Sequence, residues 1–155
     1  MKSILEDLKL KGELTLRHIR DGKVIEQVIK NLVVSAGKAG VASRINGVGA
    51  EAVFTYLAIG TGTTAPAAGD TALQAEITTG GGARAAATAS RITTTVTNDT
   101  AQLVYQWAFT ASFAVTEAGI FNAASAGTLL ARQTFSAINV VSGDRLEITW
   151  KVQVT

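Results

Sequence analysis

The sequence predicts an all-β protein, a β-sandwich of jelly-roll-like character, with an N-terminal hairpin and one short α-helix near residues 35–46. Three observations lead to this prediction. Runs of alternating apolar and polar residues recur at roughly 10-residue spacing, as in sandwiches and barrels. Polar or glycine-containing turns separate these runs. Long helical segments do not alternate with the strands, which argues against βαβ units and a parallel sheet.

The hairpin is predicted from "ELTLRHIRDGKVIEQVIKN", residues 13–31. Leu14 and Leu16 alternate with polar residues before the pair Asp21-Gly22, and a second apolar run follows. Asp-Gly between two such runs is the strongest short-range signal for a two-residue hairpin turn, because both positions tolerate positive φ. The sandwich is therefore expected to begin with two antiparallel strands.

The helix is predicted from "NLVVSAGKAGVASRINGVG", in which apolar residues fall near helical spacing at Val34, Val41 and Ile45. Ser35 is a suitable N-cap, and Gly47 after Asn46 is a suitable end. Gly37 and Gly40 each cost about 1 kcal/mol relative to alanine inside a helix. They also permit close packing of the helix against a sheet.

From residue 83 onward the pattern is almost wholly β. "ARAAATASRITTTVTND" and "QLVYQWAFTASFAV" predict an antiparallel pair joined by a turn at Asn98, Asp99 and Thr100. A short strand is expected around Ile120 and Phe121, and another through residues 129–133. "SGDRLEITWKVQV" then gives the clearest amphipathic strand of the chain.

One stretch raises the question of a nucleotide site. After a short apolar strand that ends at Gly60, the chain reads G-T-G-T-T-A, which fits the G-x-G-x-x-G/A pattern of dinucleotide-binding turns. Such a turn must open directly into a helix, with an acidic residue about 20 positions further on. Here Pro66 and A-A-G-D follow, and Glu76 lies closer than that acidic residue should. The prediction is a structural Gly-Thr loop.

No other segment predicts catalytic, cofactor-binding or metal-binding residues. His18, a lone histidine on a strand, is expected to be a surface or packing residue. Trp107 and Trp150 lie on apolar alternating faces, which favours the core over stacking on a sugar. Glu117 lies in the apolar run "FAVTEAGIF", so it is expected to be hydrogen-bonded or paired with an arginine such as Arg132.

The composition of the chain argues against some classes of function. The 155 residues correspond to one domain, with 47% hydrophobic and 17% charged residues, a net charge of +2 and no cysteine. The small, dispersed positive charge argues against a nucleic-acid partner. The beginning of the chain has no apolar segment of signal-peptide length, so a protein made in the cytoplasm, without a membrane partner, is expected. Low charge indicates faces covered by other copies or partners.

Five segments together resemble a group of tailed-bacteriophage virion proteins, over residues 31–155: "YLAIGTGTTAPAAGDTALQAEI", "ARAAATASRITTTV", "YQWAFTAS", "TEAGIFNAASAGTLLARQTF" and "SGDRLEITWKVQV". The resemblance implies a non-enzymatic structural protein of the phage particle and transfers no catalytic residue. Its main implication is a capsid cement or decoration protein that stabilises the shell. The alternative is a tail or tail-fibre protein with a receptor or sugar contact at the loops of residues 60–69 and 80–82.

The expected assembly is a homotrimer in the virion, bound to the major capsid protein or to tail proteins. Residues 13–155 are expected to form the sandwich, and residues 1–12 either an arm or its first strand. In the arm hypothesis the apolar side chains of residues 1–11 dock on a neighbouring subunit or on the shell: Ile4, Leu5, Leu8 and Leu10. In the other hypothesis the same residues belong to the first strand or to a short helix of the same domain.

Overall fold

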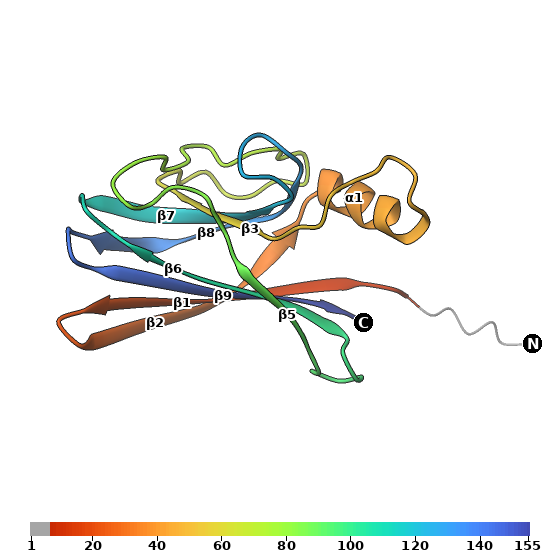
Figure 1. Cartoon of the computed structure of the whole chain (residues 1–155), viewed down its shortest axis with the longest axis horizontal. Helices are drawn as coiled ribbons and strands as arrows, with labels where there is room; N and C mark the ends of the chain where they lie inside the picture. The colour runs from red at the N-terminus through yellow and green to blue at the C-terminus, as the bar shows by residue number, and fades with distance from the viewer. Residues whose placement is uncertain (1–6) are drawn as a thin grey trace, which may run out of the picture.

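The computed structural model describes residues 7–155, which contain nine strands and one helix (Figure 1). In chain order the elements are β1 (Leu10–Arg20), β2 (Lys23–Val33), α1 (Ser35–Asn46), β3 (Tyr56–Gly60), β4 (Ala85–Ala86), β5 (Thr88–Ile92), β6 (Thr100–Ala108), β7 (Phe113–Phe121), β8 (Leu129–Val140) and β9 (Arg145–Val154). The all-β prediction with one short helix is confirmed.

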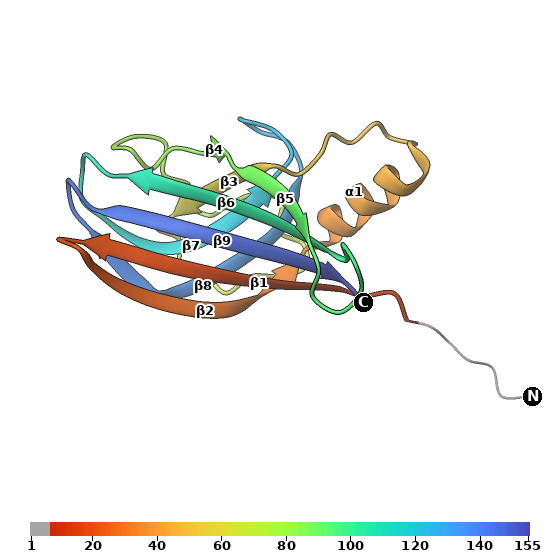
Figure 2. The ribbon, with the colours of Figure 1, turned by 60° about the horizontal axis from the view of Figure 1, so that its bottom comes forward.

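The strands form two layers that belong to one continuous antiparallel sheet, in the order β4-β3-β7-β8-β2-β1-β9-β6-β5. One layer holds β5, β6, β9, β1 and β2, and the other holds β3, β4, β7 and β8 (Figures 1 and 2). β2 joins the layers because its last residues, Leu32 and Val33, pair with Arg132 and Ala131 of β8.

The two edge strands of the sheet are neighbours in the sequence. β4 and β5 are separated only by Ala87, whose N–H donates to the carbonyl of Thr55 at 2.8 Å. The chain therefore crosses from one layer to the other on this side as well, and the sandwich is nearly closed. Short or covered edges protect a sheet against pairing with strands of other molecules.

The predicted N-terminal hairpin is confirmed. Arg20 pairs with Lys23, which leaves a two-residue loop at Asp21 and Gly22 with φ of 49° and 75°. Positive φ at both positions is what a type I′ turn requires, and its twist matches that of the flanking strands. β1 also pairs along its length with β9, so the hairpin is an integral part of the larger layer.

The predicted helix is confirmed as α1, and its end is as expected. Gly47 is left-handed, with φ of 74°, and its N–H donates to the carbonyl of Ser43 at 2.7 Å. The N-cap prediction was wrong: the cap is Val34 and no side chain caps the helix. Ser35 is the first helical residue, and its N–H donates to the carbonyl of Ala68 at 2.8 Å. A tertiary partner therefore satisfies the amide that a side-chain cap would satisfy.

The turn between β5 and β6 is longer than predicted. Pairing ends at Ile92 and Thr100, so residues 93–99 form a loop. The Asp99 carboxylate accepts hydrogen bonds from the backbone amides of Thr94, Thr95 and Val96 at 2.8–2.9 Å. These local side-chain bonds replace the ladder that the threonine-rich run was expected to continue.

The main core lies between the two layers. Its largest fully buried side chains include both tryptophans, as predicted, and the indole N–H groups donate at 2.8 and 2.7 Å to the carbonyl of Ala83 and to Asn31 Oδ1. A smaller cluster lies in the layer of β3 and β7, apart from the main core: Val34, Ala58, Leu73, Phe121 and Leu129. All residues from Val115 to Phe121 of β7 are buried, so this strand is covered on both faces.

The packing of α1 on β8 makes Gly37→Ala a test of the fold. A Cβ at Gly37 would overlap the backbone carbonyl of Leu130, whereas one at Gly40 would meet the end of the Phe54 ring, which can move. We expect Gly37→Ala to lower the free energy of unfolding by about 1–3 kcal/mol. Gly40→Ala, the matched control, should stay within about 1 kcal/mol of wild type because helix propensity offsets the crowding. Urea unfolding measures both, and equal effects would contradict the close contact of α1 with β8.

Candidate functional site

A buried carboxylate organises the loop that follows β3. Glu117, on β7, has no exposed surface. Its Oε1 accepts the backbone N–H groups of Gly62 and Ala75 at 3.1 and 2.8 Å, and its Oε2 accepts that of Gln74 at 3.1 Å. A buried charge is costly unless it is paired and hydrogen-bonded, and this one is both.

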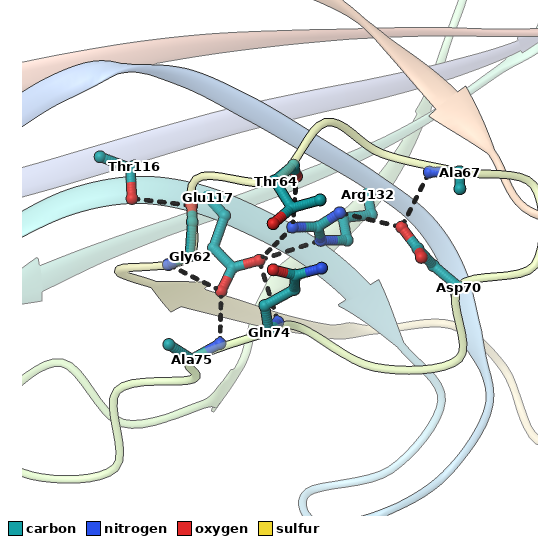
Figure 3. Close-up of polar contacts among 9 residues, drawn as sticks. All are labelled: Gly62, Thr64, Ala67, Asp70, Gln74, Ala75, Thr116, Glu117 and Arg132. Carbon is teal, nitrogen blue, oxygen red and sulfur yellow. Dashed lines mark hydrogen bonds and ion pairs between the residues drawn. The ribbon is translucent and has the colours of Figure 1, made fainter.

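The partner of Glu117 is Arg132 on β8, as the sequence predicted. Arg132 Nε and Nη2 lie 2.9 and 2.8 Å from Glu117 Oε2, and Arg132 is also fully buried. Its Nη1 donates to Asp70 Oδ2 at 2.9 Å, and its Nη2 donates to the carbonyl of Thr64 at 3.0 Å. Figure 3 shows how the guanidinium lies between Glu117, on the sheet, and the loop residues Thr64 and Asp70. We call Glu117, Arg132 and Asp70 the ionic hub.

Two further contacts fix the loop to the hub. Asp70 accepts the N–H of Ala67 at 2.9 Å, and this bond, with the guanidinium of Arg132, holds the pKa of Asp70 below its usual range. Thr116 donates its hydroxyl to the carbonyl of Gly62 at 2.8 Å (Figure 3). The loop then returns to β3 through a bridge between Glu76 and Gly60. Residues 61–75 are therefore held mainly by hydrogen bonds to side chains of β7 and β8, and not by the backbone ladder of a strand.

The glycines of the G-T-G sequence are required by the carboxylate. A Cβ at Gly60 or at Gly62 would lie 2.5 Å from Glu117 Oε1. Neither glycine has positive φ, so both positions require glycine because of the limited space and not because of the backbone conformation. No helix follows the motif before β4, which confirms the prediction of a structural loop. The G-x-G pattern in this chain therefore reflects the space that the buried side chain of Glu117 occupies.

The second glycine-rich loop is a tight turn. Gly80 and Gly81 have φ of 60° and 83°, and the N–H of Gly82 donates to the carbonyl of Thr79 at 3.0 Å. A Cβ at Gly81 would overlap the carbonyl of Ala108. The nearby Arg84 pairs with Glu76 at 2.6 Å and lies over the ring of Phe121, 3.5 Å from its centre. This loop is thus packed against the end of β6.

His18 belongs to a second polar cluster, at the end of the β1–β2 hairpin. Its Nε2 lies 2.8 Å from Asp144 Oδ2, and Arg20 forms hydrogen bonds of 2.6–3.0 Å with the same carboxylate. The Arg20 guanidinium, together with His18 and the N–H of Val141, holds the pKa of Asp144 well below its usual range. The cluster ties the hairpin to the turn that precedes β9, so His18 has a packing role, one of the two roles expected from the sequence.

Of the interface residues expected from the sequence, the structure describes two, Leu8 and Leu10. Leu10 is the first residue of β1 and packs against the core, whereas Leu8 is 72% exposed. Ile4 and Leu5 fall outside the described residues. Their docking stays a prediction.

The two fully buried members of the hub, Glu117 and Arg132, leave no reactive atom facing solvent. Each oxygen of Glu117 and each terminal nitrogen of Arg132 already has a protein partner. Among residues 7–155, no three histidine, cysteine or acidic side chains gather as metal ligands would, and no helix could span a membrane. The arrangement fits a scaffold that holds an exposed loop, including Thr61, Thr63 and Thr64, in a fixed position.

Sequence reasoning found the ion pair but missed the rest of the hub. Asp70 and the amides of Gly62, Gln74 and Ala75 come from the loop, and no periodic pattern marks them. The signal available was the pair Gly60 and Gly62, because glycine is the usual residue where another group approaches the backbone closely.

The model of one protein family, described as Podophage GP4 fiber I protein gp80, matches residues 45–153, well over half of the chain. The matched span begins near the end of α1 and includes β3 to β8 and most of β9, and with them the ionic hub. No curated protein and no solved structure matches the chain.

The ionic hub predicts a large and specific loss of stability. Removing one partner of a buried ion pair strands the other charge, so Arg132→Ala should lower the free energy of unfolding by about 3–5 kcal/mol. Glu117→Gln should destabilise as well, because it removes the charge opposite Arg132. The exposed Arg91→Ala is the matched control and should stay within about 0.5 kcal/mol of wild type. A loss for Arg132→Ala no larger than that of the control, in urea unfolding, would refute the hub.

The lowered pKa of Asp144 predicts a pH dependence. A carboxyl whose pKa is lower in the folded than in the unfolded state contributes stability above its unfolded pKa, about 3.9, and that contribution disappears as the pH falls toward the folded pKa. Stability should therefore fall between about pH 5 and about pH 2, and Asp144→Asn should be less stable at pH 7 but show a smaller fall. Asp70 and Asp99, whose pKa values are also lowered, should leave a residual slope. An unchanged pH profile in Asp144→Asn would contradict the assignment.

Proposed function

Because the chain belongs to the family described as Podophage GP4 fiber I protein gp80, and is thus a structural protein of a tailed-phage virion, we propose that it is a subunit of the tail fibre. The family match is the observation that carries this proposal. Of the two locations expected from the sequence, it favours the tail or fibre. Capsid cement, the main expectation from the sequence, has no comparable support.

Three structural features fit a fibre subunit. The sheet is nearly closed, and the strands at its two ends, β4 and β5, are short, so these ends offer little length for strand addition by another copy. The loop of residues 61–75 is fastened by the ionic hub and presents exposed threonine hydroxyls. The buried charges of Glu117 and Arg132 bind groups of the protein itself, which suits a protein that works by contact rather than by catalysis.

In this proposal the protein acts as a homo-oligomer, with a trimer as the expected state. Closed cyclic assemblies prevent unlimited growth through head-to-tail contacts. The fastened loops of residues 60–69 and 80–82 are the proposed surface for a receptor or sugar on the host. Tail proteins are the proposed neighbours within the virion.

Antibody labelling of intact particles tests the location. Gold-labelled antibody against the chain should decorate the tail fibres in electron micrographs and leave the heads unlabelled. Particles treated with the same antibody after absorption with purified protein provide the control. Label over the heads would contradict the fibre proposal and support capsid cement, and absence of label on every particle would place the protein outside the virion.

The oligomeric state is measured on purified protein by light scattering coupled to size-exclusion chromatography. The expected mass is about three times the 16.0 kDa of one chain. A mass of one chain at micromolar concentration would contradict the trimer and leave the location to the labelling experiment.

A further inference from the structure

The sheet has a free edge in addition to its two ends, β4 and β5. β2 pairs with β8 at Leu32 and Val33, the last two residues of the strand. Among residues 7–155, the preceding residues of β2, 23–31, pair with β1 on one side and with no strand on the other. Figure 2 shows β2 at the margin of its layer, with no strand beyond it. We call residues 23–31 the β2 edge.

β8 lies on the core side of this edge and not beside it. The side chain of Gln27 faces the core, because Gln27 lies opposite the buried Leu16, and it donates to the carbonyl of Ser136 on β8 at 3.3 Å. Arg20, at the end of β1, likewise donates to the carbonyl of Asn139 at 2.8 Å. Side chains therefore span the distance to β8. The lateral side of the β2 edge is open to another molecule.

Every second residue of the β2 edge directs its backbone N–H and C=O groups away from β1. The two-residue loop makes Arg20 and Lys23 a hydrogen-bonded pair, and hydrogen-bonded and non-hydrogen-bonded pairs alternate along an antiparallel ladder. The backbone groups of the even-numbered residues therefore point outward. Leu32 agrees with this alternation, because it pairs with β8 on that side. The outward residues of the edge are Val24, Glu26, Val28 and Lys30.

The side chains of the same four residues lie on the solvent-facing side of the layer. Val24 and Val28 are 46% and 56% exposed. Unpaired backbone groups beside exposed β-branched side chains form a template for an added strand. Charged residues on an edge normally discourage such pairing. The positions of Glu26 and Lys30 therefore decide which strand fits.

The order of these charges makes the β2 edge complementary to itself. Two β2 strands can pair antiparallel with a two-fold axis at Val28, which places Glu26 of each copy opposite Lys30 of the other. Glu26 lies 3.8 Å from Arg17 Nε in its own copy, and Lys30 forms no ion pair among residues 7–155, so both charges can take a new partner. We propose that the β2 edges of two copies of this chain pair in this register.

Neighbouring two-fold registers lose the match of charges. An axis at Glu26 places two carboxylates directly opposite each other, an axis at Lys30 does the same with two ammonium groups, and both arrangements are destabilising. An axis at Gln27 or at Ile29 leaves both charged residues opposite apolar ones. With the axis at Val28, three hydrogen-bonded pairs form, which corresponds to about six backbone hydrogen bonds between the copies.

The contact is isologous, because each copy contributes the same edge. Pairing occupies the edge of both copies, so the sheet does not grow further through it. The proposal does not depend on the fibre function, and the expected trimer needs a three-fold contact elsewhere on the molecule. Both contacts together would join two trimers. Because one pair of strands is a small interface, the pairing is expected to be weak in dilute solution and to increase with concentration.

Disulfide cross-linking tests the pairing, since the chain has no cysteine of its own. Opposed residues of a hydrogen-bonded pair have Cα atoms about 5.5 Å apart, within the range of a disulfide. Full-length Val28→Cys, concentrated and oxidised, should therefore give a covalent product of two chains on denaturing, non-reducing electrophoresis. Val96→Cys is the matched control, because Val96 is 66% exposed in the loop before β6. Its yield should be about tenfold lower, since pairing raises the effective concentration of the thiols at residue 28.

Charge reversal tests the register. In the Val28→Cys background, Glu26→Lys places like charges opposite each other at both ends of the pair, so the yield should fall to that of the control. Adding Lys30→Glu makes the opposed charges opposite in sign again and should restore the yield. The three positions are exposed, so the variants are expected to fold, which circular dichroism checks.

Two results would overturn the proposal. A Val28→Cys yield equal to that of Val96→Cys would mean that the β2 edges do not pair. A high yield that Glu26→Lys leaves unchanged, or that Lys30→Glu fails to restore after its loss, would refute the self-complementary register. Neither result bears on the fibre location, which the particle labelling decides independently.

Discussion

The ion pair between Glu117 and Arg132 is the interaction that holds the loop of residues 61–75 on strands β7 and β8. Both side chains are fully buried, so each must find partners for all its polar atoms. The loop of residues 61–75 supplies these partners as backbone amides, a carbonyl and the carboxylate of Asp70. The dependence is mutual, because the loop has few backbone bonds of its own and the charges have no access to water. A segment without regular secondary structure is in this way fastened to the sheet by hydrogen bonds to two buried side chains.

Closure of the sheet is the second constraint. β2 bends from one layer to the other, and residues 85–92 do the same on the opposite side. The outer edges of the sheet are thus short or covered, and lateral growth by strand pairing is opposed.

Local patterns predicted the local structure well. Asp21-Gly22 identified the hairpin, Gly47 identified the end of α1, and strict alternation identified β9. An acidic residue within an apolar run was enough to predict the pair of Glu117 with an arginine. Features that depend on distant residues could not be found in this way: the carbonyl of Ala68 that replaces a side-chain cap on α1, the contribution of Asp70 to the hub, and the amides that surround Glu117. The threonine-rich run after Ile92 misled the strand prediction because Asp99 binds its backbone more effectively than a neighbouring strand.

The most direct test of this account is amide hydrogen exchange in the loop of residues 61–75, measured residue by residue by NMR. Loop amides usually exchange rapidly because their opening free energies are low. If the ionic hub holds the loop as described, the amides of Gly62, Gln74 and Ala75 should be protected to a degree close to that of the core strands β7 and β8. Exchange of these three amides at the rate of an open loop would contradict the central role of the Glu117–Arg132 pair.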